Sequence, residues 1–274
     1  ANIGGRHEGQ GPLAAYFDEL SDDGFFGEKT WEKAESTMQK RVLGRALEKA
    51  GLTFSDIDFV FAGDLLNQCI GTSFGLRDSG IPFYGLYGAC STMGESLALA
   101  SLLLDGGYAD RAAALTSSHF CTAERQYRMP VPYGSQRTPT AQWTATAAGC
   151  AILGREGSGP AVTAVTCGKI VDKGITDANN MGAAMAPPPT TPCPPTLPPP
   201  APGPGTTTWW SPGTWGPWVT RSWRTSLPGT GWIWAGTTPT AACCSTIFKI
   251  RTCTPGPAAA AARRRCCAAT CWGR

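Results

Sequence analysis

One cysteine lies where the chain is expected to turn sharply from a strand into a helix. The segment Gly88-Ala-Cys-Ser-Thr92 follows an apolar run, and a predicted helix begins directly after it. A thiol at a helix start faces unpaired backbone N–H groups and the positive end of the helix dipole, and both favour the thiolate. Cys90 is therefore a candidate nucleophile for acyl transfer, and Cys90 with Ser91 is a candidate anion site. The competing interpretation is a small buried Cys with a packing role.

Ligand groups gather at the carboxyl ends of strands in α/β sheets, so polar residues that follow predicted strands are further candidates for the same cleft. They are Asp64, Asn67, His119, Glu124 and Arg125. For the first two the competing interpretation is a role in a turn, and for the other three it is a loop network that only satisfies backbone groups. No cofactor and no metal site are expected.

The clearest predicted helix covers residues 30–50, where apolar residues recur at three- and four-residue steps. Thr30 can cap its start, and Gly51 supplies a left-handed stop. The charged residues of this segment, Glu35 among them, are assigned to the solvent face. A weaker helix is expected over 68–79.

The remaining elements alternate along the chain. A helix is expected at 93–105, where Thr92 and Glu95 have the spacing of a capping box. Apolar segments predict strands at 56–62, 82–87, 111–117, 142–153 and 162–171. Strands that alternate with helices predict an α/β fold, with a largely parallel sheet that is covered on both faces.

The composition changes abruptly near residue 187. All 20 Asp and Glu lie at or before Asp177, whereas the 23 Lys and Arg divide into 15 in residues 1–187 and 8 in 188–274. The first segment therefore carries a net charge of −5 and the second +8, and most of the prolines and tryptophans fall in the second. Proline at this density is incompatible with helices and central strands, so we expect 1–187 to fold and 188–274 to lack a native fold.

Several motifs, in one order, resemble the stage V sporulation protein AD family, a thiolase-like family of endospore-forming bacteria. They are Gly63-Asp-Leu-Leu-Asn-Gln68, Gly88-Ala-Cys-Ser-Thr92, Thr116-Ser-Ser-His119 with Thr122-Ala-Glu-Arg-Gln126, and Asp177 with Met181-Gly-Ala-Ala-Met-Ala-Pro187. The resemblance implies a thiolase-like fold of two similar α/β halves, of which this chain has the first. The family's first strand is expected to precede Gly5 and to be absent here.

The resemblance also implies a function. The family is associated with uptake of dipicolinic acid, carried with calcium, into the developing spore. It implies other spore membrane transport proteins as partners, no nucleic acid, a possible homodimer, and a peripheral place on the cytoplasmic side of the forespore or spore inner membrane. No run of 18 apolar residues predicts a membrane span. A thiolase-like acyltransferase that uses Cys90 and a structural scaffold are the alternatives, and whether the family is enzymatic stays open.

The second segment is better explained as a shifted reading frame than as a proline-rich linker or a basic tail. If each codon of 205–219 begins one base earlier, one permitted product starts Asp-Tyr-Asp-Leu-Val-Val-Thr-Gly-Asp-Leu. That product is similar to Asp56-Ile-Asp-Phe-Val-Phe-Ala-Gly-Asp-Leu in the first segment. A duplicated fold would repeat this strand, so we expect a frameshift near 186–190 and a chain that is non-functional as written.

Overall fold

The computed structural model describes residues 1–127, 144–157, 160–167, 172 and 174–176, together with three strands farther along the chain. Its helices are α1 (Trp31–Ala50), α2 (Ile70–Leu76), α3 (Thr92–Asp105) and α4 (Phe120–Tyr127). Its strands are β1 (Asn2–Gly4), β2 (Glu19–Leu20), β3 (Phe59–Gly63), β4 (Phe83–Gly85), β5 (Arg111–Ser118), β6 (Ala147–Gly154), β7 (Pro160–Thr166), β8 (Thr206–Ser211), β9 (Thr246–Thr252) and β10 (Cys267–Thr270).

Helix α1 begins and ends where the sequence predicts. The Thr30 side chain accepts a hydrogen bond from the Lys33 backbone N–H at 3.3 Å, so one of the unpaired donors of the first turn is satisfied. Gly51 adopts a left-handed conformation with φ 65°, and its N–H reaches back to the carbonyls of the last turn. Helix α4 was not expected, because its residues follow a predicted strand and were interpreted as a loop.

The strands next to α1 form a sheet that is only partly parallel. β4, β3 and β5 lie side by side and run parallel, whereas β6 runs antiparallel to β5. The sheet is thus mixed, because one connection, between β5 and β6, returns the chain in the opposite direction. The expectation that no strand precedes Gly5 was wrong, since β1 pairs with the far edge of β6 from Asn2 to Gly4.

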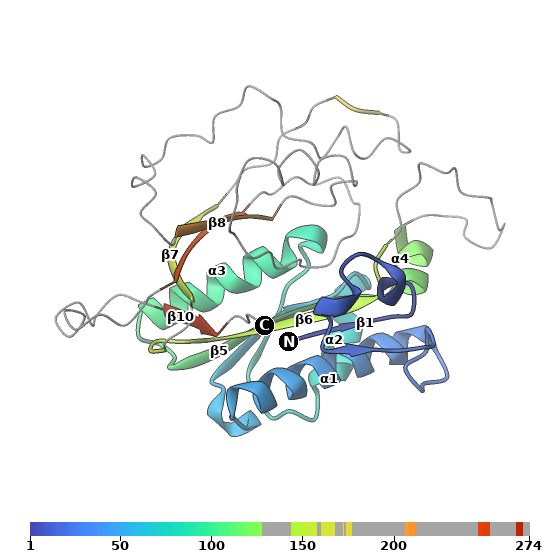
Figure 1. Ribbon diagram of the computed structural model, residues 1–274, viewed down its shortest axis with the longest axis horizontal. Coiled ribbons are helices and arrows are strands. Elements are labelled where there is room, and N and C mark those ends of the chain that lie inside the picture. Colours follow the sequence, from blue (N-terminus) through green and yellow to red (C-terminus); the bar gives the residue numbers. More distant parts are fainter. Residues whose placement is uncertain are drawn as a thin grey trace.

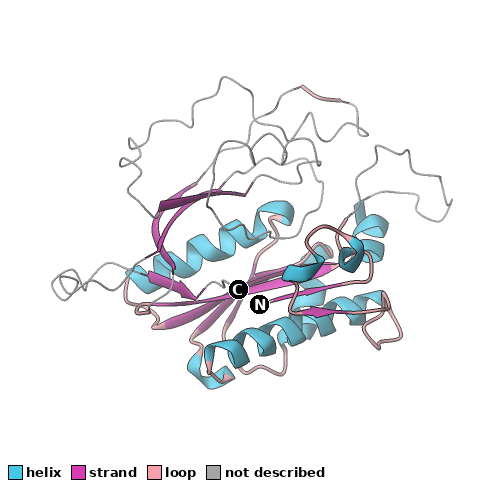
Figure 2. Ribbon diagram, in the orientation of Figure 1, coloured by secondary structure: helices cyan, strands magenta, loops and turns pink. Residues whose placement is uncertain are grey.

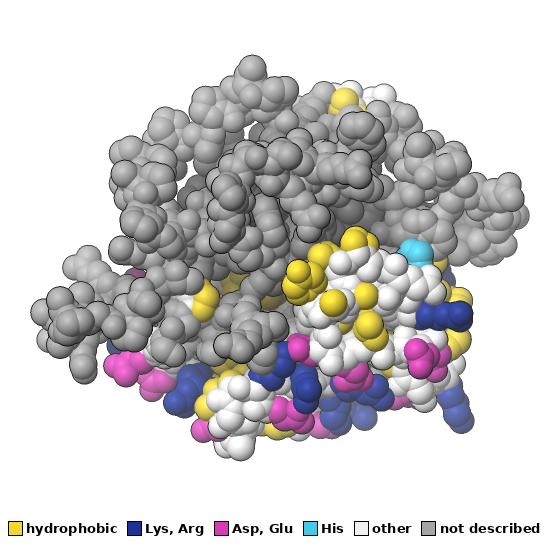
Figure 3. Space-filling model, viewed as in Figure 1, with side chains coloured by type: hydrophobic (Ala, Val, Ile, Leu, Met, Phe, Trp, Pro, Cys, Tyr) yellow, Lys and Arg dark blue, Asp and Glu magenta, His cyan; other side chains and the backbone are white. Residues whose placement is uncertain are grey.

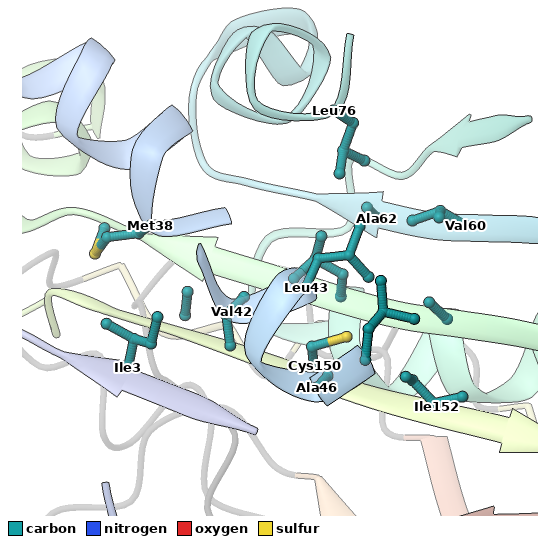
Figure 4. Packing of buried hydrophobic residues seen from close by; sticks show 14 of the residues in the cluster. Ile3, Met38, Val42, Leu43, Ala46, Val60, Ala62, Leu76, Cys150 and Ile152 are labelled. Atoms are coloured by element: carbon teal, nitrogen blue, oxygen red, sulfur yellow. The ribbon is translucent and has the colours of Figure 1, made fainter. Parts of the chain in front are cut away.

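Helices cover both faces of this sheet, as expected for an α/β fold (Figures 1 and 2). Helices α1 and α2 lie on one face. The core there contains fully buried Met38, Val42 and Leu43 of α1, which pack against side chains of β1, β3 and β6 (Figure 4). Burial of each such side chain stabilises the fold by ~1.5–3 kcal/mol.

Helix α3 covers the opposite face. Its fully buried Ala100 and Leu104 pack with Phe61 of β3 and Leu153 of β6. Both sides of α3 are apolar, and its only charged residues are Glu95 and Asp105. Such a helix needs cover on both sides, in contrast to α1, beside which Lys and Arg alternate with Asp and Glu on the surface (Figure 3).

The structure describes three strands within residues 188–274. β8 pairs with β9, β9 pairs with β7, and β10 pairs with both β6 and β7, all antiparallel. β7 lies over α3, and its Val162 and Val165 join the core on that side. The rest of 188–274 lies outside the described residues, so the expectation that this segment lacks a native fold stays a prediction.

Truncating the core under α1 should destabilise the chain far more than truncating an exposed leucine of α3. We expect Leu43→Ala to lower the free energy of unfolding by ~2–5 kcal/mol, because it removes a fully buried side chain and leaves a cavity. Leu102→Ala is the control, since Leu102 is 57% exposed. Urea unfolding followed by circular dichroism measures both, and equal losses would contradict the described core.

Candidate functional site

The carboxyl ends of the three parallel strands bring separate segments to one edge of the sheet. β3 ends at Gly63 and leads to Asp64, β4 leads to the turn before α3, and β5 ends at Ser118 and leads to His119. A Cβ on Gly63 would lie 1.9 Å from the Leu86 carbonyl oxygen, so only glycine permits this close approach of β3 to the Cys90 turn.

The Cys90 turn is as sharp as the sequence predicts. Ala89–Ser91 forms a single 3-10 turn that runs directly into α3, and the Ser91 hydroxyl donates to the Gly88 carbonyl at 2.8 Å. Ala89 has a left-handed φ of 48°, which costs a non-glycine residue ~1 kcal/mol or more. Cys90 itself is half-buried. The predicted strand-to-helix turn is therefore confirmed, and it carries backbone strain beside the cysteine.

The capping box expected at Thr92 was wrong. Ser91 takes the N-cap position, and its side chain makes no capping hydrogen bond. Thr92 is the first residue of α3 and only 1% exposed, and its Oγ1 has no hydrogen-bond partner within the part of the chain that is described. A buried hydroxyl without a partner costs about 1–3 kcal/mol, so the start of α3 retains unused hydrogen-bonding capacity.

Asp64 holds its own loop. One carboxylate oxygen accepts from the Leu66 N–H at 2.7 Å, and the other accepts from the Thr72 N–H at 2.6 Å and the Thr72 hydroxyl at 2.5 Å. The side chain is 1% exposed. Of the two interpretations of Asp64, the geometry favours the turn role, which fixes the loop between β3 and α2. This loop contains Gln68 and Cys69, both with left-handed φ.

A buried polar network connects Asp64 to Glu35 of α1. The Gln39 amide donates to the Thr72 hydroxyl at 2.7 Å and to the Ser117 hydroxyl at 2.8 Å. The Ser117 hydroxyl in turn donates to Glu35 at 3.1 Å. The network therefore joins α1, α2 and the ends of β3 and β5.

Assigning Glu35 to the solvent face of α1 was wrong, because this glutamate is fully buried. Helix α2 packs against the side of α1 that carries Glu35 and Gln39, and a Cβ on Gly75 of α2 would lie 2.7 Å from the Ser36 carbonyl oxygen. The Thr122 hydroxyl of α4 donates to the second oxygen of Glu35 at 2.8 Å. Tertiary packing therefore widens the buried stripe of α1 beyond its apolar residues.

Glu35 and Asp64 share a buried environment in which one proton is retained. Burial, followed by the negative charge of Asp64, raises the pKa of Glu35 to about 8. Burial also raises the pKa of Asp64, but its three donors favour the charged form, so we assign the charge to Asp64 and the proton to Glu35.

Both contacts of the His119 ring are with backbone groups. Its Nε2 lies 2.6 Å from the Gly24 carbonyl oxygen, and its Nδ1 accepts from the Cys121 N–H at 3.2 Å. Both ring nitrogens are thus engaged by the backbone, with the proton on Nε2. Burial lowers the pKa of His119, which favours the neutral ring. The competing interpretation of a structural network fits this residue.

The printed contacts of the other candidates are with residues outside the Cys90 turn. Glu124 is buried and accepts from the Thr144 hydroxyl at 3.1 Å. Arg125 is directed along the surface, where it forms an ion pair with Glu32 and lies over the Trp31 ring. Asn67 is exposed at the start of the loop that Asp64 holds. The structure therefore brings Cys90 and Ser91 together in one turn, with the Asp64 loop behind them.

No group of three or more His, Cys, Asp or Glu side chains among the described residues is arranged to hold a metal ion. Among the described helices, none combines the length and the apolar character that a membrane crossing requires.

The mixed sheet with helices on both faces defines an α/β protein with a cysteine at the strand-to-helix turn before α3. A sequence model of the stage V sporulation protein AD family matches residues 1–191. The chain is also 45% identical to stage V sporulation protein AD of Bacillus subtilis (strain 168) over 183 residues. The aligned region covers 67% of this chain and 54% of that protein. The chain therefore belongs to the stage V sporulation protein AD family, and it spans about half the length of that relative.

The solved structures that the chain resembles include two synthases. A 3-oxoacyl-[acyl-carrier-protein] synthase III from Aquifex aeolicus VF5 is 15% identical with a TM-score of 0.39, and the match covers 54% of this chain and 48% of that one. Germicidin synthase from Streptomyces coelicolor, a type III polyketide synthase, is 15% identical with a TM-score of 0.41, covering 56% and 44%.

The shared proton of Glu35 and Asp64 predicts a pH dependence of stability. The folded-state pKa of Glu35 lies above its unfolded value, so its contribution is complete below pH 4.5 and is lost as the pH rises through 8. We expect Glu35→Gln to be more stable than the parent by roughly a few kcal/mol above pH 8, because the amide cannot ionise and can donate to the Thr122 hydroxyl.

The measurement is denaturant unfolding of both proteins from pH 4.5 to 9. Glu48→Gln, on the exposed face of the same helix, is the matched control and should follow the parent at every pH. If the parent and Glu35→Gln keep a constant difference across this range, Glu35 does not hold the proton.

Proposed function

We propose that the intact family protein binds a small aromatic dicarboxylate, dipicolinic acid, at the Cys90 turn during sporulation, and that this chain is non-functional as written. Family membership supports the link to sporulation. In the same proposal the intact protein is peripheral, on the cytoplasmic side of the forespore or spore inner membrane. There it works with membrane transport proteins and pairs as a homodimer.

The start of α3 supports binding of an anion. The preceding 3-10 turn pairs the N–H groups of Ser91 and Thr92 with the carbonyls of Gly88 and Ala89, so the following N–H groups of the first turn are the ones left for a ligand. The helix dipole adds a partial positive charge there. The unused Thr92 hydroxyl and the Ser91 side chain lie in the same turn. A carboxylate is the ligand group that such a site favours.

Within the part of the fold that this chain covers, the observation that supports binding over catalysis is the pair of ring contacts that His119 makes. Acyl transfer at Cys90 needs a base that takes the thiol proton. His119 makes its two ring contacts with Gly24 and Cys121 instead, so it is not available as that base. The remaining histidine of the sequence, His7, is exposed near the start of the chain.

The proposed frameshift explains why the match to the family ends close to the point where the composition changes. The family model ends at residue 191, and the last acidic residue is Asp177. In this proposal the second half of the fold is encoded in another frame, and residues 188–274 do not replace it. The nucleotide sequence across codons 180–195 tests this part directly, and an uninterrupted family-like frame through that region would exclude it.

An acyltransferase is the alternative that the Cys90 turn itself favours. In that reaction the Cys90 sulfur would attack the thioester carbonyl of an acyl-CoA, and the bond to the CoA sulfur would break. Cys90 would then carry the acyl group as a thioester, and its proton would leave on the released CoA thiol.

One experiment distinguishes the two functions. The 274-residue chain and a frame-restored chain are titrated with dipicolinate by calorimetry, and each is incubated with acetyl-CoA for intact-protein mass spectrometry. We expect saturable dipicolinate binding by the frame-restored chain, no acyl adduct, and an at least tenfold loss of affinity in Cys90→Trp, which fills the turn. Cys167→Trp, at an exposed cysteine, is the control and should bind as the parent does.

The other outcomes decide against the proposal. An acyl adduct that disappears in Cys90→Ser but persists in Cys167→Ser would establish the acyltransferase instead. If neither dipicolinate binding nor an acyl adduct is observed, the structural scaffold is the hypothesis that remains. Equal binding by both chains would show that the first half is sufficient and would remove the claim that this chain is non-functional.

A further inference from the structure

One carboxyl group near the Cys90 turn has no partner. Glu95 is the acidic residue in the first turn of α3, and it is half-buried. Within the described part of the chain its carboxyl group makes no hydrogen bond and no ion pair. A half-buried carboxyl that no neighbouring group engages is free to bind a ligand in place of solvent.

Glu95 leans back over the turn that carries Cys90. The point where a Cβ on Gly88 would lie is 2.7 Å from a carboxyl oxygen of Glu95, 2.5 Å from the Ser91 hydroxyl and 3.6 Å from the Thr92 backbone nitrogen. Three polar groups therefore converge beside Gly88, and the missing side chain of this glycine leaves room for them. The Glu95 carboxyl consequently lies at the N-terminal end of α3, where an anion would bind.

A second, independent group at the same place is also unsatisfied. Thr92, the first residue of α3, is 1% exposed, and its Oγ1 lacks a hydrogen-bond partner among the described residues. The start of α3 thus combines the buried hydroxyl of Thr92 with the half-buried carboxyl of Glu95, and both can form hydrogen bonds to a ligand. Both can donate to a carboxylate, the hydroxyl always and the carboxyl only when it is protonated.

The environment of Glu95 favours the protonated form. Burial is the cause that raises its pKa above the ordinary value of a glutamate. The titratable groups on the neighbouring segments are Tyr87 and Cys90 in the turn and Asp64 at the end of β3, and none of them contributes to this shift. A dicarboxylate that binds beside Glu95 would raise the pKa further, because two carboxylates in contact share one proton.

We propose that Glu95 binds the ligand as a carboxylic acid, donating its O–H to a carboxylate of the dicarboxylate at the Cys90 turn, so that each ligand bound takes up one proton from solvent. This inference rests on the proposed function and adds to it a specificity-determining residue and a condition for binding. An ionised Glu95 repels the anion, and a protonated one holds it. The ligand is therefore bound at low pH and released as the pH rises.

Calorimetry of dipicolinate binding in buffers of different ionisation enthalpy measures the proton uptake directly. The 274-residue chain and its frame-restored form are titrated between pH 5.5 and 8.5. We expect uptake of about one proton per ligand at the high end of this range, with the dissociation constant rising about tenfold per pH unit there. Glu95→Gln should bind without proton uptake and with a dissociation constant that changes less than about threefold over the range, because its amide donates at every pH.

Two controls separate a binding role from a structural one. Glu156→Gln removes an exposed carboxyl outside α3 and should keep the parent's proton uptake. Urea unfolding of Glu95→Gln without ligand should be within about 1 kcal/mol of the parent, the size of a first-turn dipole effect. If Glu95 only stabilises the helix, its substitution changes this stability and leaves the proton uptake of binding intact.

The outcomes for the two proposals differ. Binding without proton uptake, or a Glu95→Gln variant that keeps the parent's pH dependence, overturns the role of Glu95 and leaves the proposed function standing. Absence of dipicolinate binding by both forms of the chain overturns both. Binding that tightens as the pH rises would show that an ionised Glu95 serves the ligand and would also reject the inference.

Discussion

The structure depends on a buried set of hydrogen bonds at the carboxyl ends of its parallel strands. Gln39 of α1 donates hydrogen bonds to one hydroxyl from α2 and to one from β5. Each of these hydroxyls in turn donates a hydrogen bond to a buried carboxyl group. Because every member of this chain is buried, any misplacement of α1 would leave several polar groups unsatisfied. The network therefore specifies how α1, α2 and the strand ends fit together, where apolar packing alone would tolerate small shifts.

This rigid edge is what positions the Cys90 turn. Gly63 allows β3 to approach the Leu86 carbonyl, and the thiol of Cys69, in the loop held by Asp64, donates to the same carbonyl at 3.2 Å. The strained Ala89 follows in the turn itself. The N-terminus of α3, with its partial positive charge, is thus positioned by the end of β3 and by the loop that Asp64 orders. Such an arrangement is suited to binding an anion without rearrangement. Acyl transfer needs a base that reaches Cys90, and both ring nitrogens of His119 are engaged by backbone groups instead.

Most of the elements of the first segment could be predicted because their signals are local. The cap at Thr30, the stop at Gly51 and the apolar period between them belong to α1 alone. The apolar runs that form β3, β4 and β5 likewise need no knowledge of their neighbours. The failures have different causes. Glu35 follows the polar pattern of a solvent face, and only the packing of α2 and α4 against α1 buries it. Helix α4 was missed because its eight residues are too few for a clear period.

The sequence by itself determined the α/β class, the sharp turn at Cys90 and the change of character near residue 187, since these depend on residue type and on neighbours along the chain. Only the tertiary structure decided what each polar residue does. It engages His119 with backbone groups, directs Arg125 to the surface, and places the carboxyl group of Glu95 beside Gly88. Hydrogen bonds join groups that are distant in sequence, such as Gln39 and Ser117, so the spacing of residues along the chain could not foretell them.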